Sequence, residues 1–429
     1  MLRAGHGLVL AVLTLLVIGI VMVNSAGLVV APDPALLQSG QVSEAQFQRM
    51  LANYRPISFE QIFFGRTTIL AFISLAALAA AAFVPVDRML TLRGARSPIP
   101  WLLGSILLAL LLVHVPGIGR EVNHSARWIG SPTYGFQASE LAKWGMVCVM
   151  SWYCVRHSAT LRSFFRGFLP ALAIVGMVAA LIAVEDLGTG ALVFVACLML
   201  LVVGGMRWGH VLLLLPLGLL GAAAAVVTSP YRVNRLLAWS NPWADPEGIG
   251  YHIIQSMSAI AGGGMQGLGL GNSVQKFGYL PEDTTDFIFA IVCEELGVFG
   301  ALMVLATYAL LLLAGLAIVT RGASRHDADA IVSPFSRLVG TGVLFIIGLQ
   351  ALINVLVVTG LAPTKGIALP LLSSGGSGWV MTCFSLGLLL SIERTSRANE
   401  RALGIDLDAP PRGEGARVSM PTAWNAPVG

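Results

Sequence analysis

Long apolar runs alternate with short polar segments along almost the whole chain. Runs close to the ~20 residues that a helix needs to cross a ~30 Å hydrocarbon core fall at 8–30, 67–86, 100–117, 138–155, 168–185, 187–205, 209–228, 286–319, 336–359 and 377–392. We place a turn between the fifth and sixth runs, at Glu185-Asp186, because two carboxylates inside one membrane helix would be costly without partners. The pattern predicts an all-α, polytopic membrane protein with about ten transmembrane helices.

The composition fits this class and adds an orientation. Hydrophobic residues make up 56% of the 429 residues and charged residues 11%, whereas soluble domains carry roughly a quarter charged residues. With the N-terminus inside, the cytoplasmic segments hold 16 of 26 Lys and Arg but 8 of 22 Asp and Glu. Because basic residues concentrate in cytoplasmic loops, we predict that both termini are cytoplasmic. We interpret the first apolar run as a retained signal anchor rather than a cleaved signal peptide.

The polar segments divide the chain. Residues 1–393 are predicted to form one membrane domain, with an external loop at 31–66 in which 42–54 is expected to form a short surface helix. The segment 229–285, between the seventh and eighth spans, is longer than ordinary connections and therefore a functional candidate. Its Trp, Tyr and Ile content argues against disorder, so we interpret it as an external catalytic loop. Residues 394–429 lack periodicity and are predicted to be a disordered cytoplasmic tail.

Several function classes find no support. The sequence has no glycine-rich phosphate loop ending in Gly-Lys-Ser/Thr, and its arginine-rich segments are short cytoplasmic loops, which argues against nucleotide hydrolysis and nucleic-acid binding. The five cysteines lie in apolar runs without metal or disulfide spacing. No cofactor is therefore required by the sequence, and no metal site is predicted.

Asp286 is the polar residue that most needs an explanation. It follows the acidic stretch Leu280-Pro-Glu-Asp-Thr-Thr and begins the apolar run that continues to Val319. A carboxylate at the mouth of a membrane helix is costly unless it is solvated, paired or used. We interpret Asp286 as a general base at the external water boundary.

A second polar cluster begins the fourth span. Glu140 and Lys143 are three residues apart and share one helix face, so Lys143 can pair with Glu140 or with Asp186. One interpretation is a structural ion pair; the other is a cavity wall that orients a phosphate or a sugar. The glycine-rich run 262–271 likewise allows close helix packing or a backbone cradle for phosphate oxygens, with packing favoured.

Several motifs occur together in one order. They include Ala126-Arg-Trp-Ile129, Ser139-Glu-Leu-Ala-Lys143, Asp186-Leu-Gly-Thr189, Gly250-Tyr-His-Ile-Ile-Gln-Ser256, Leu280-Pro-Glu-Asp-Thr-Thr-Asp-Phe287, Pro363-Thr-Lys-Gly366 and Leu369-Pro-Leu-Leu-Ser-Ser-Gly-Gly-Ser377. Together with the span count, the series resembles the SEDS family of polytopic cell-wall glycosyltransferases, the FtsW/RodA group. The chain departs from the usual family wording at Ala138, Glu185, Thr284 and Ser374.

The resemblance implies a reaction. It implies polymerisation of lipid II, an undecaprenyl-pyrophosphate-linked disaccharide-pentapeptide, into β-1,4 glycan at the outer face of the bacterial cytoplasmic membrane. Asp286 matches the family's catalytic aspartate, and the reaction would proceed by a single inverting displacement. The leaving pyrophosphate calls for positive groups, for which the candidates are Arg127, Arg232, Arg235, Lys276 and Lys365. Headgroup contact or anchoring in the membrane interface is the alternative role for each arginine.

The resemblance also implies further cavity residues and partners. Glu140, Lys143 and Asp186 would line the substrate cavity, together with Trp128, Gln255, Ser256 and Ser373. Trp128 could equally belong to an interfacial tryptophan belt. A divalent cation near the pyrophosphate would be chemically sensible, although no ligand set for it is visible. The expected partners are a class B penicillin-binding transpeptidase, other division proteins and membrane lipid.

Alternatives remain open at this point. The wording Pro363-Thr-Lys-Gly366 favours the division-type FtsW branch over the elongation-type RodA branch. A lipid II flippase would need a similar polar cavity, but it should carry charged residues across the membrane to the cytoplasmic side. The acidic groups here gather at the predicted external face, which favours an enzyme. A non-catalytic scaffold for division proteins is the third hypothesis.

Overall fold

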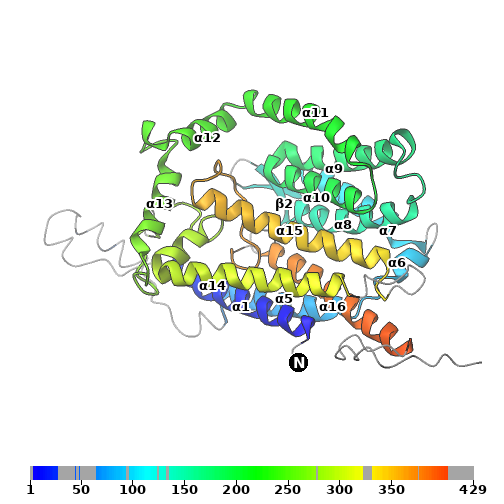
Figure 1. Cartoon of the computed structure of the whole chain (residues 1–429). Helices are drawn as coiled ribbons and strands as arrows, with labels where there is room; N and C mark the ends of the chain where they lie inside the picture. Colours follow the sequence, from blue (N-terminus) through cyan, green and yellow to red (C-terminus); the bar gives the residue numbers. More distant parts are fainter. Residues whose placement is uncertain are drawn as a thin grey trace, which may run out of the picture.

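Each apolar run of the sequence forms a helix in the computed structural model, which describes residues 3–27, 44, 48, 64–92, 96–122, 125–131, 135–276, 279–321, 331–374 and 376–403. Figure 1 shows these helices as a bundle. They are α1 (Ala4–Ala26), α5 (Arg66–Ala81), α7 (Pro98–Leu112), α8 (Ala138–Arg156), α9 (Leu169–Glu185), α10 (Leu187–Val203), α11 (Trp208–Val227), α14 (Ile288–Val319), α15 (Pro334–Val358) and α16 (Ser377–Ala402). The turn expected at Glu185-Asp186 is confirmed, because α9 ends and α10 begins there.

The helices have the length and composition of membrane spans. Within the described residues, five segments are long and apolar enough to cross a membrane: Ala4–Ala26, Phe164–Glu185, Trp208–Val227, Ile288–Val319 and Pro334–Val358. Shorter apolar helices lie at Arg66–Ala81, Pro98–Leu112 and Leu187–Val203. The chain is therefore a polytopic, predominantly α-helical membrane protein. The total of ten crossings and the cytoplasmic position of both termini stay predictions.

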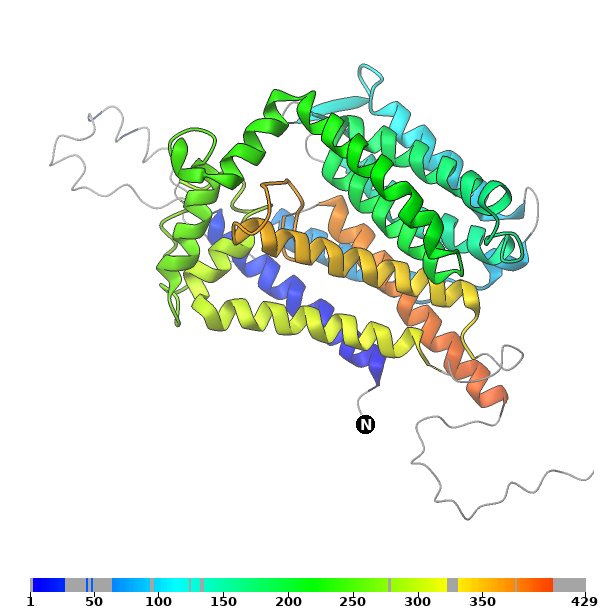
Figure 2. The same cartoon turned by 45° about the horizontal axis from the view of Figure 1, so that its top comes forward.

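Small residues allow helices to approach closely where they cross. A Cβ added to Gly387 of α16 would lie 2.3 Å from the Leu78 carbonyl oxygen of α5, and one added to Gly190 of α10 would lie 2.8 Å from the Ala179 carbonyl oxygen of α9. Apolar burial drives little association between helices in lipid, so such contacts carry much of the packing. Figure 2 shows α15 passing between the α9–α10 side of the bundle and the side formed by α1 and α14.

A small antiparallel sheet, which the sequence did not predict, lies between α7 and α8. Its strands are β1 (Gly119–Val122), β2 (Ser125–Gly130) and β3 (Gly135–Gln137), in the order β1-β2-β3. The strands are too short to show an alternating apolar pattern. The all-α prediction therefore holds for the membrane part but misses this sheet, which carries Arg127.

The segment 229–285 contains more regular structure than a catalytic loop implies. It holds α12 (Pro230–Ser240), a 3-10 turn at Pro242–Ala244 and α13 (Tyr251–Gly263). In Figure 1 these helices run down the left side of the molecule, linking α11 at the top to α14 below. None of the α11 residues whose burial the structure describes is buried against the rest of the protein.

The glycine-rich run packs against a break in α14. Gly297 interrupts α14 with φ 66°, and the amides of Leu268 and Gly269 donate to the carbonyls of Glu294 and Glu295 just before the break. A Cβ added to Gly267, at φ 80°, would lie 2.2 Å from the Glu295 carbonyl oxygen. These amides are occupied by the protein itself, so close packing, rather than a phosphate cradle, is the role of this part of the run.

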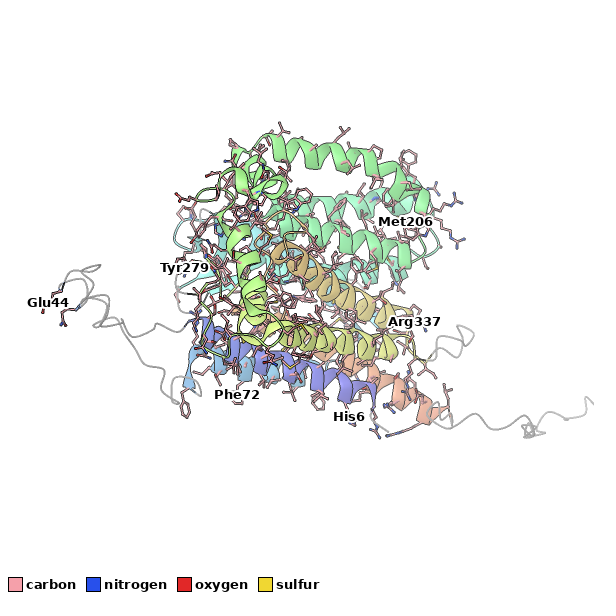
Figure 3. All side chains as sticks on the ribbon, turned by 60° about the vertical axis from the view of Figure 1, so that its left-hand side comes forward. His6, Glu44, Phe72, Met206, Tyr279 and Arg337 are labelled. Atoms are coloured by element: carbon pink, nitrogen blue, oxygen red, sulfur yellow. The ribbon has the colours of Figure 1, made fainter. Side chains whose placement is uncertain are left out.

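Polar side chains gather at both ends of the bundle. At one end, the Arg321 guanidinium pairs with Glu400, and Ser333 and Ser336 donate to Asp87. In Figure 3, His6 and Arg337 mark this end and Tyr279 lies at the other, where the acidic stretch precedes α14.

Helix α16 continues to Ala402, which corrects the tail boundary placed at 394. Most of the segment 42–54 and all residues after 403 lie outside the described residues.

Candidate active site

Asp286 lies in the turn that leads into α14, so it precedes the membrane helix instead of beginning it. The Asn354 side-chain amide, from α15, donates to the Asp286 carbonyl oxygen at 2.8 Å. Gly366 lies directly against the carboxylate, since a Cβ added there would be 2.9 Å from Oδ2 of Asp286. The aspartate is thus held by its backbone while its carboxyl group faces the segment that contains Gly366.

The surroundings of Asp286 make it a stronger base than an ordinary aspartate. The pKa of Asp286 is raised from 3.8 to about 7. Burial is the main cause, and the negative charges of Glu282 and Asp186 add to it. The positive charges of Arg127 and Arg235 oppose this rise. Efficient general bases have a pKa close to the working pH. Asp286 therefore meets the electrostatic requirement as well as the positional one.

Arg127, which lies on β2 of the small sheet, places its positive charge near the Asp286 carboxylate. Its Nη1 donates to Oδ2 of Asp186 at 2.9 Å. Asp186 in turn caps the start of α10, accepting from the Thr189 amide at 3.0 Å and from the Thr189 hydroxyl at 2.9 Å. The pair thus joins β2 to the α9–α10 corner, facing Asp286.

The segment between α15 and α16 carries Lys365 into the same region. Burial lowers the pKa of Lys365, and Arg232 and Arg235 lower it further, against the opposing charge of Asp186. Arg235 donates from Nη1 to the Thr364 carbonyl oxygen at 3.1 Å and lies over the Tyr231 ring, 4.4 Å from its centroid. Arg232 donates to the Ala225 carbonyl oxygen at 2.8 Å. Both arginines belong to α12, so the long loop does contribute charge to the site.

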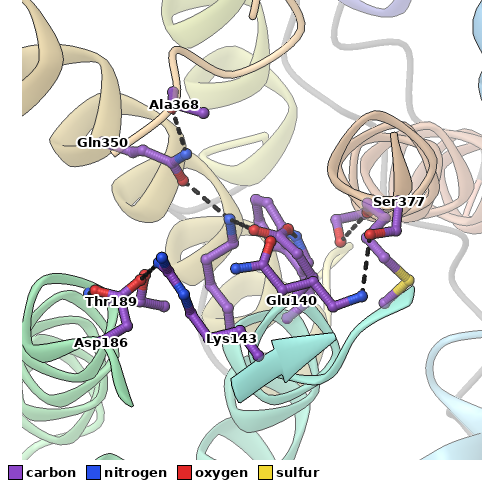
Figure 4. Close-up of polar contacts among 12 residues, drawn as sticks. Glu140, Lys143, Asp186, Thr189, Gln350, Ala368 and Ser377 are labelled. Atoms are coloured by element: carbon purple, nitrogen blue, oxygen red, sulfur yellow. Dashed lines mark hydrogen bonds and ion pairs between the residues drawn. The ribbon is translucent and has the colours of Figure 1, made fainter. Parts of the chain in front are cut away.

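Glu140 and Lys143 form the ion pair that their spacing predicted. Lys143 Nζ lies 2.7 Å from Glu140 Oε1 and also donates to Gln350 Oε1 at 3.0 Å. Gln350 extends this chain of hydrogen bonds, because its side-chain amide donates to the Ala368 carbonyl oxygen at 2.7 Å. Figure 4 shows this chain of contacts beside the Asp186–Thr189 cap. Asp186 is paired with Arg127, so the alternative pairing of Lys143 with Asp186 does not occur.

Ser373 fixes the acidic turn from the other side. Its hydroxyl donates to the Thr285 carbonyl oxygen at 2.6 Å and accepts from the Leu369 amide at 2.7 Å. The Ser374 amide donates to the Thr284 carbonyl oxygen at 2.8 Å. Ser373 therefore positions the turn before Asp286 through its backbone.

Lys276 requires a correction. Its side chain is fully buried, with Nζ 3.3 Å from Glu295 Oε1 and 3.2 Å from the Ser25 carbonyl oxygen. Because this ammonium neutralises a buried glutamate and ties α1 to α14, we withdraw its assignment to the leaving pyrophosphate.

Three other predicted positions are less central to the site. Ser256 is fully buried and donates to the Val358 carbonyl oxygen at 2.7 Å, so it packs α13 on α15. Trp128 packs on its own sheet, where a Cβ on Gly135 would lie 3.1 Å from its ring. Gln255 is half-buried in α13.

Sequence reasoning missed Gln350, Asn354 and Gly366. The first two are four residues apart in the later, mostly apolar part of α15, and polar residues inside a membrane helix are functional candidates. That signal was available in the sequence. The contact of Gly366 with Asp286 depends on tertiary structure and left no local signal.

No compact metal site occurs in the described part of the chain, where no three His, Cys, Asp or Glu side chains form a group suited to a metal ion. The positive charge that faces Asp286 comes from side chains, namely Arg127 and Arg235. The arrangement is suited to removing a proton beside an anionic leaving group.

Comparison with known proteins identifies the family. The sequence pattern of the FtsW/RodA/SpoVE cell cycle proteins matches residues 42–398. The chain belongs to the FtsW/RodA/SpoVE family. The stage V sporulation protein E of Bacillus subtilis is 40% identical over 67% of this chain and 76% of its own length. A probable peptidoglycan glycosyltransferase FtsW of Nitrosococcus halophilus is 42% identical over 70% of this chain and 76% of its own length.

Solved structures of FtsW/RodA/SpoVE relatives show the same fold. A chain from a peptidoglycan synthase complex that coordinates polymerization and crosslinking superposes with a TM-score of 0.63 at 26% identity, covering 91% of this chain and 97% of that one. The Thermus thermophilus rod shape determining protein RodA superposes with a TM-score of 0.55 at 24% identity, covering 90% and 96%. The membrane fold is therefore that of the family.

Proposed function

We propose that this chain is a peptidoglycan glycosyltransferase that polymerises lipid II into β-1,4 glycan strands at the outer face of the bacterial cytoplasmic membrane. The observation that carries the proposal is the position of the Asp286 carboxyl group, which lies against Gly366 in the region that also holds the positive charges of Arg127 and Arg235. The relatives named peptidoglycan glycosyltransferases support the same class. Their name FtsW favours septal synthesis during cell division over cell elongation.

In the proposed reaction, Asp286 removes the proton of the acceptor sugar hydroxyl. The hydroxyl oxygen forms a bond to the anomeric carbon of the lipid-linked glycan, and the bond from that carbon to the pyrophosphate oxygen breaks. One displacement turns an α-linked pyrophosphate into a β-glycoside, so no covalent enzyme intermediate is needed. The polyprenyl pyrophosphate leaves as an anion, and the proton remains on Asp286.

Positive side chains stabilise that leaving group. Arg127, Arg235 and Lys365 are brought together by β2, α12 and the segment after α15. Fixed charges aimed at developing negative charge are among the largest contributions to catalysis. The pyrophosphate itself supplies the driving force, so no organic cofactor is needed. A divalent cation bound to the pyrophosphate oxygens would add to the same stabilisation, and its removal by a chelator tests that addition.

A transpeptidase is the proposed partner. The structural relative with a TM-score of 0.63 comes from a complex described as coordinating polymerization and crosslinking. A class B penicillin-binding transpeptidase would crosslink the strands that this chain extends. Other division proteins would recruit the pair to the septum.

Polymerisation of labelled lipid II by the purified protein, alone and with the transpeptidase, tests the proposal. Glycan strands longer than the starting disaccharide unit are expected, and chelator addition in a parallel reaction measures any cation requirement. A flippase would instead move labelled lipid II across vesicle membranes without extending it. Translocation without polymer from a folded protein would contradict the proposed function.

A further inference from the structure

Glu185 and Asp186, at the junction of α9 and α10, bind three consecutive residues of β2, namely Ser125, Ala126 and Arg127. The carboxylate of Glu185 accepts from the Ala126 amide at 2.7 Å and from the Ser125 hydroxyl at 3.2 Å, and the Glu185 carbonyl oxygen accepts from that hydroxyl at 2.9 Å. The next residue, Asp186, binds Arg127. Two adjacent carboxylates thus hold the strand on both sides of the Ala126–Arg127 peptide bond.

The sheet alone does not fix Arg127. In the β1–β2 ladder, Arg120 pairs with Trp128 and Glu121 with Ala126, so Arg127 is the extra residue of a bulge. Pairing of β2 with β3 starts only at Trp128. Bulges next to active sites re-aim side chains, and the bulged residue is left without a ladder partner. The hydrogen bond from the Ala126 amide to Glu185 restrains the backbone beside Arg127, which the strand pairing does not.

The surroundings of the contact favour a defined geometry. The carboxylate lies in a small pocket lined by His114, Arg127 and Ser139 among others, and His114 Nδ1 is 3.8 Å from Glu185 Oε1. Among the described residues, the buried Arg127 Nε has no hydrogen-bond partner, and the guanidinium donates to Asp186 through Nη1. A guanidinium with so few bonds depends on the position of its backbone.

We propose that Glu185 is a positioning residue that holds Arg127 toward the anionic leaving group. Glu185 acts through the Ala126 amide and never touches substrate. The inference rests on the proposed function, because it requires the leaving group to be a pyrophosphate.

Glycan polymerisation by Glu185→Ala, Glu185→Gln and Arg127→Ala, each at equal folded yield, tests the inference. A reacting group misplaced by about 1 Å can cost on the order of 100-fold in rate, so we expect Glu185→Ala to lower kcat by about 10- to 100-fold with a smaller change in KM. Glu185→Gln should recover most of the rate, because its amide oxygen can accept from Ala126. Glu121→Ala, which removes an exposed carboxylate from the neighbouring strand, is the matched control and should behave like the native chain.

The double variant separates positioning from folding. Glu185→Ala should cost little once Arg127 is already alanine, because coupled residues are not additive. Native kcat in Glu185→Ala, or equal losses with and without Arg127, would overturn the positioning role while leaving the glycosyltransferase activity intact. Native kcat in Arg127→Ala would overturn it as well. Absence of polymer from the native chain would contradict the proposed function, and the inference with it.

Discussion

Asp286 shows how a single carboxylate acquires base strength from its neighbours. Its surroundings contain charges of both signs: Glu282 and Asp186 favour the protonated form, whereas Arg127 and Arg235 favour the ionised form. Burial decides the outcome, since it disfavours the charged carboxylate. The resulting pKa of about 7 leaves a substantial ionised fraction at neutral pH.

The charge of Glu282 gives a prediction for the pH dependence of the native enzyme. A base must be ionised to accept a proton, so kcat/KM should fall as the pH drops through about 7, and kcat/KM reports groups of the free enzyme. Because a nearby negative charge raises the pKa of Asp286, Glu282→Gln should move the acid limb to lower pH. The exposed Glu247→Gln should leave it in place. An acid limb that stays fixed or moves upward in Glu282→Gln would argue against this electrostatic account.

Gly366 gives a second prediction at this scale. A methyl group at this position would lie 2.9 Å from the Asp286 carboxylate, closer than ordinary contacts, so Gly366→Ala should displace the carboxyl group. We expect polymerisation to fall about 10- to 100-fold while the melting temperature stays near native, because the contacted atom ends a movable side chain. Gly262→Ala, where nothing lies within 4 Å, should retain native activity. Native activity in Gly366→Ala would show that this contact does not set the position of the base.

Among the elements, the broken helix α14 depends on a buried charge pair. Lys276 and Glu295 are both fully buried in their side chains, and Ser25 of α1 donates to the same carboxylate at 2.6 Å. Removing one partner of a buried pair leaves an uncompensated charge, which typically costs about 3–5 kcal/mol. The pair therefore matters for assembly of the end of the bundle where α1 meets the broken part of α14.

Lys276→Met should lower the free energy of unfolding of the detergent-solubilised protein by about 3–5 kcal/mol. The double change Lys276→Met with Glu295→Leu should recover part of the loss, because no unpaired charge remains. Unfolding followed by near-ultraviolet circular dichroism measures both. A Lys276→Met protein with native stability and no polymerisation would instead place Lys276 at the substrate.

How far the elements could be predicted depended on how local their causes are. Apolar runs specify helices because a membrane span must satisfy its own backbone hydrogen bonds, and each expected run is indeed helical. The sequence did not predict the sheet that carries Arg127, because its strands are short and β2 is held by Glu185, which is distant in the sequence. Gln350 and Asn354 left a readable signal on α15, whereas the contact of Gly366 with Asp286 exists only in the folded chain.

On the scale of the whole molecule, a mostly apolar helical scaffold gathers charged and polar side chains at the end where Asp286 lies. Helices α8, α10, α12 and α15 each contribute a group to this end, namely Lys143, Thr189, Arg235 and Asn354. Charged groups held away from bulk water interact strongly. The fold therefore brings sequence motifs that are far apart in the chain to one polar end of the helical bundle.

The most direct test of the account compares glycan polymerisation from labelled lipid II by the native chain, Asp286→Asn and Asp283→Asn, each with the transpeptidase present and at equal folded yield. Asp283 is the informative comparison, since burial also raises its pKa, to about 6, three residues away. We predict polymer from the native chain and from Asp283→Asn, and none from Asp286→Asn. Polymer from Asp286→Asn at the native rate would contradict the assignment of Asp286 as the base.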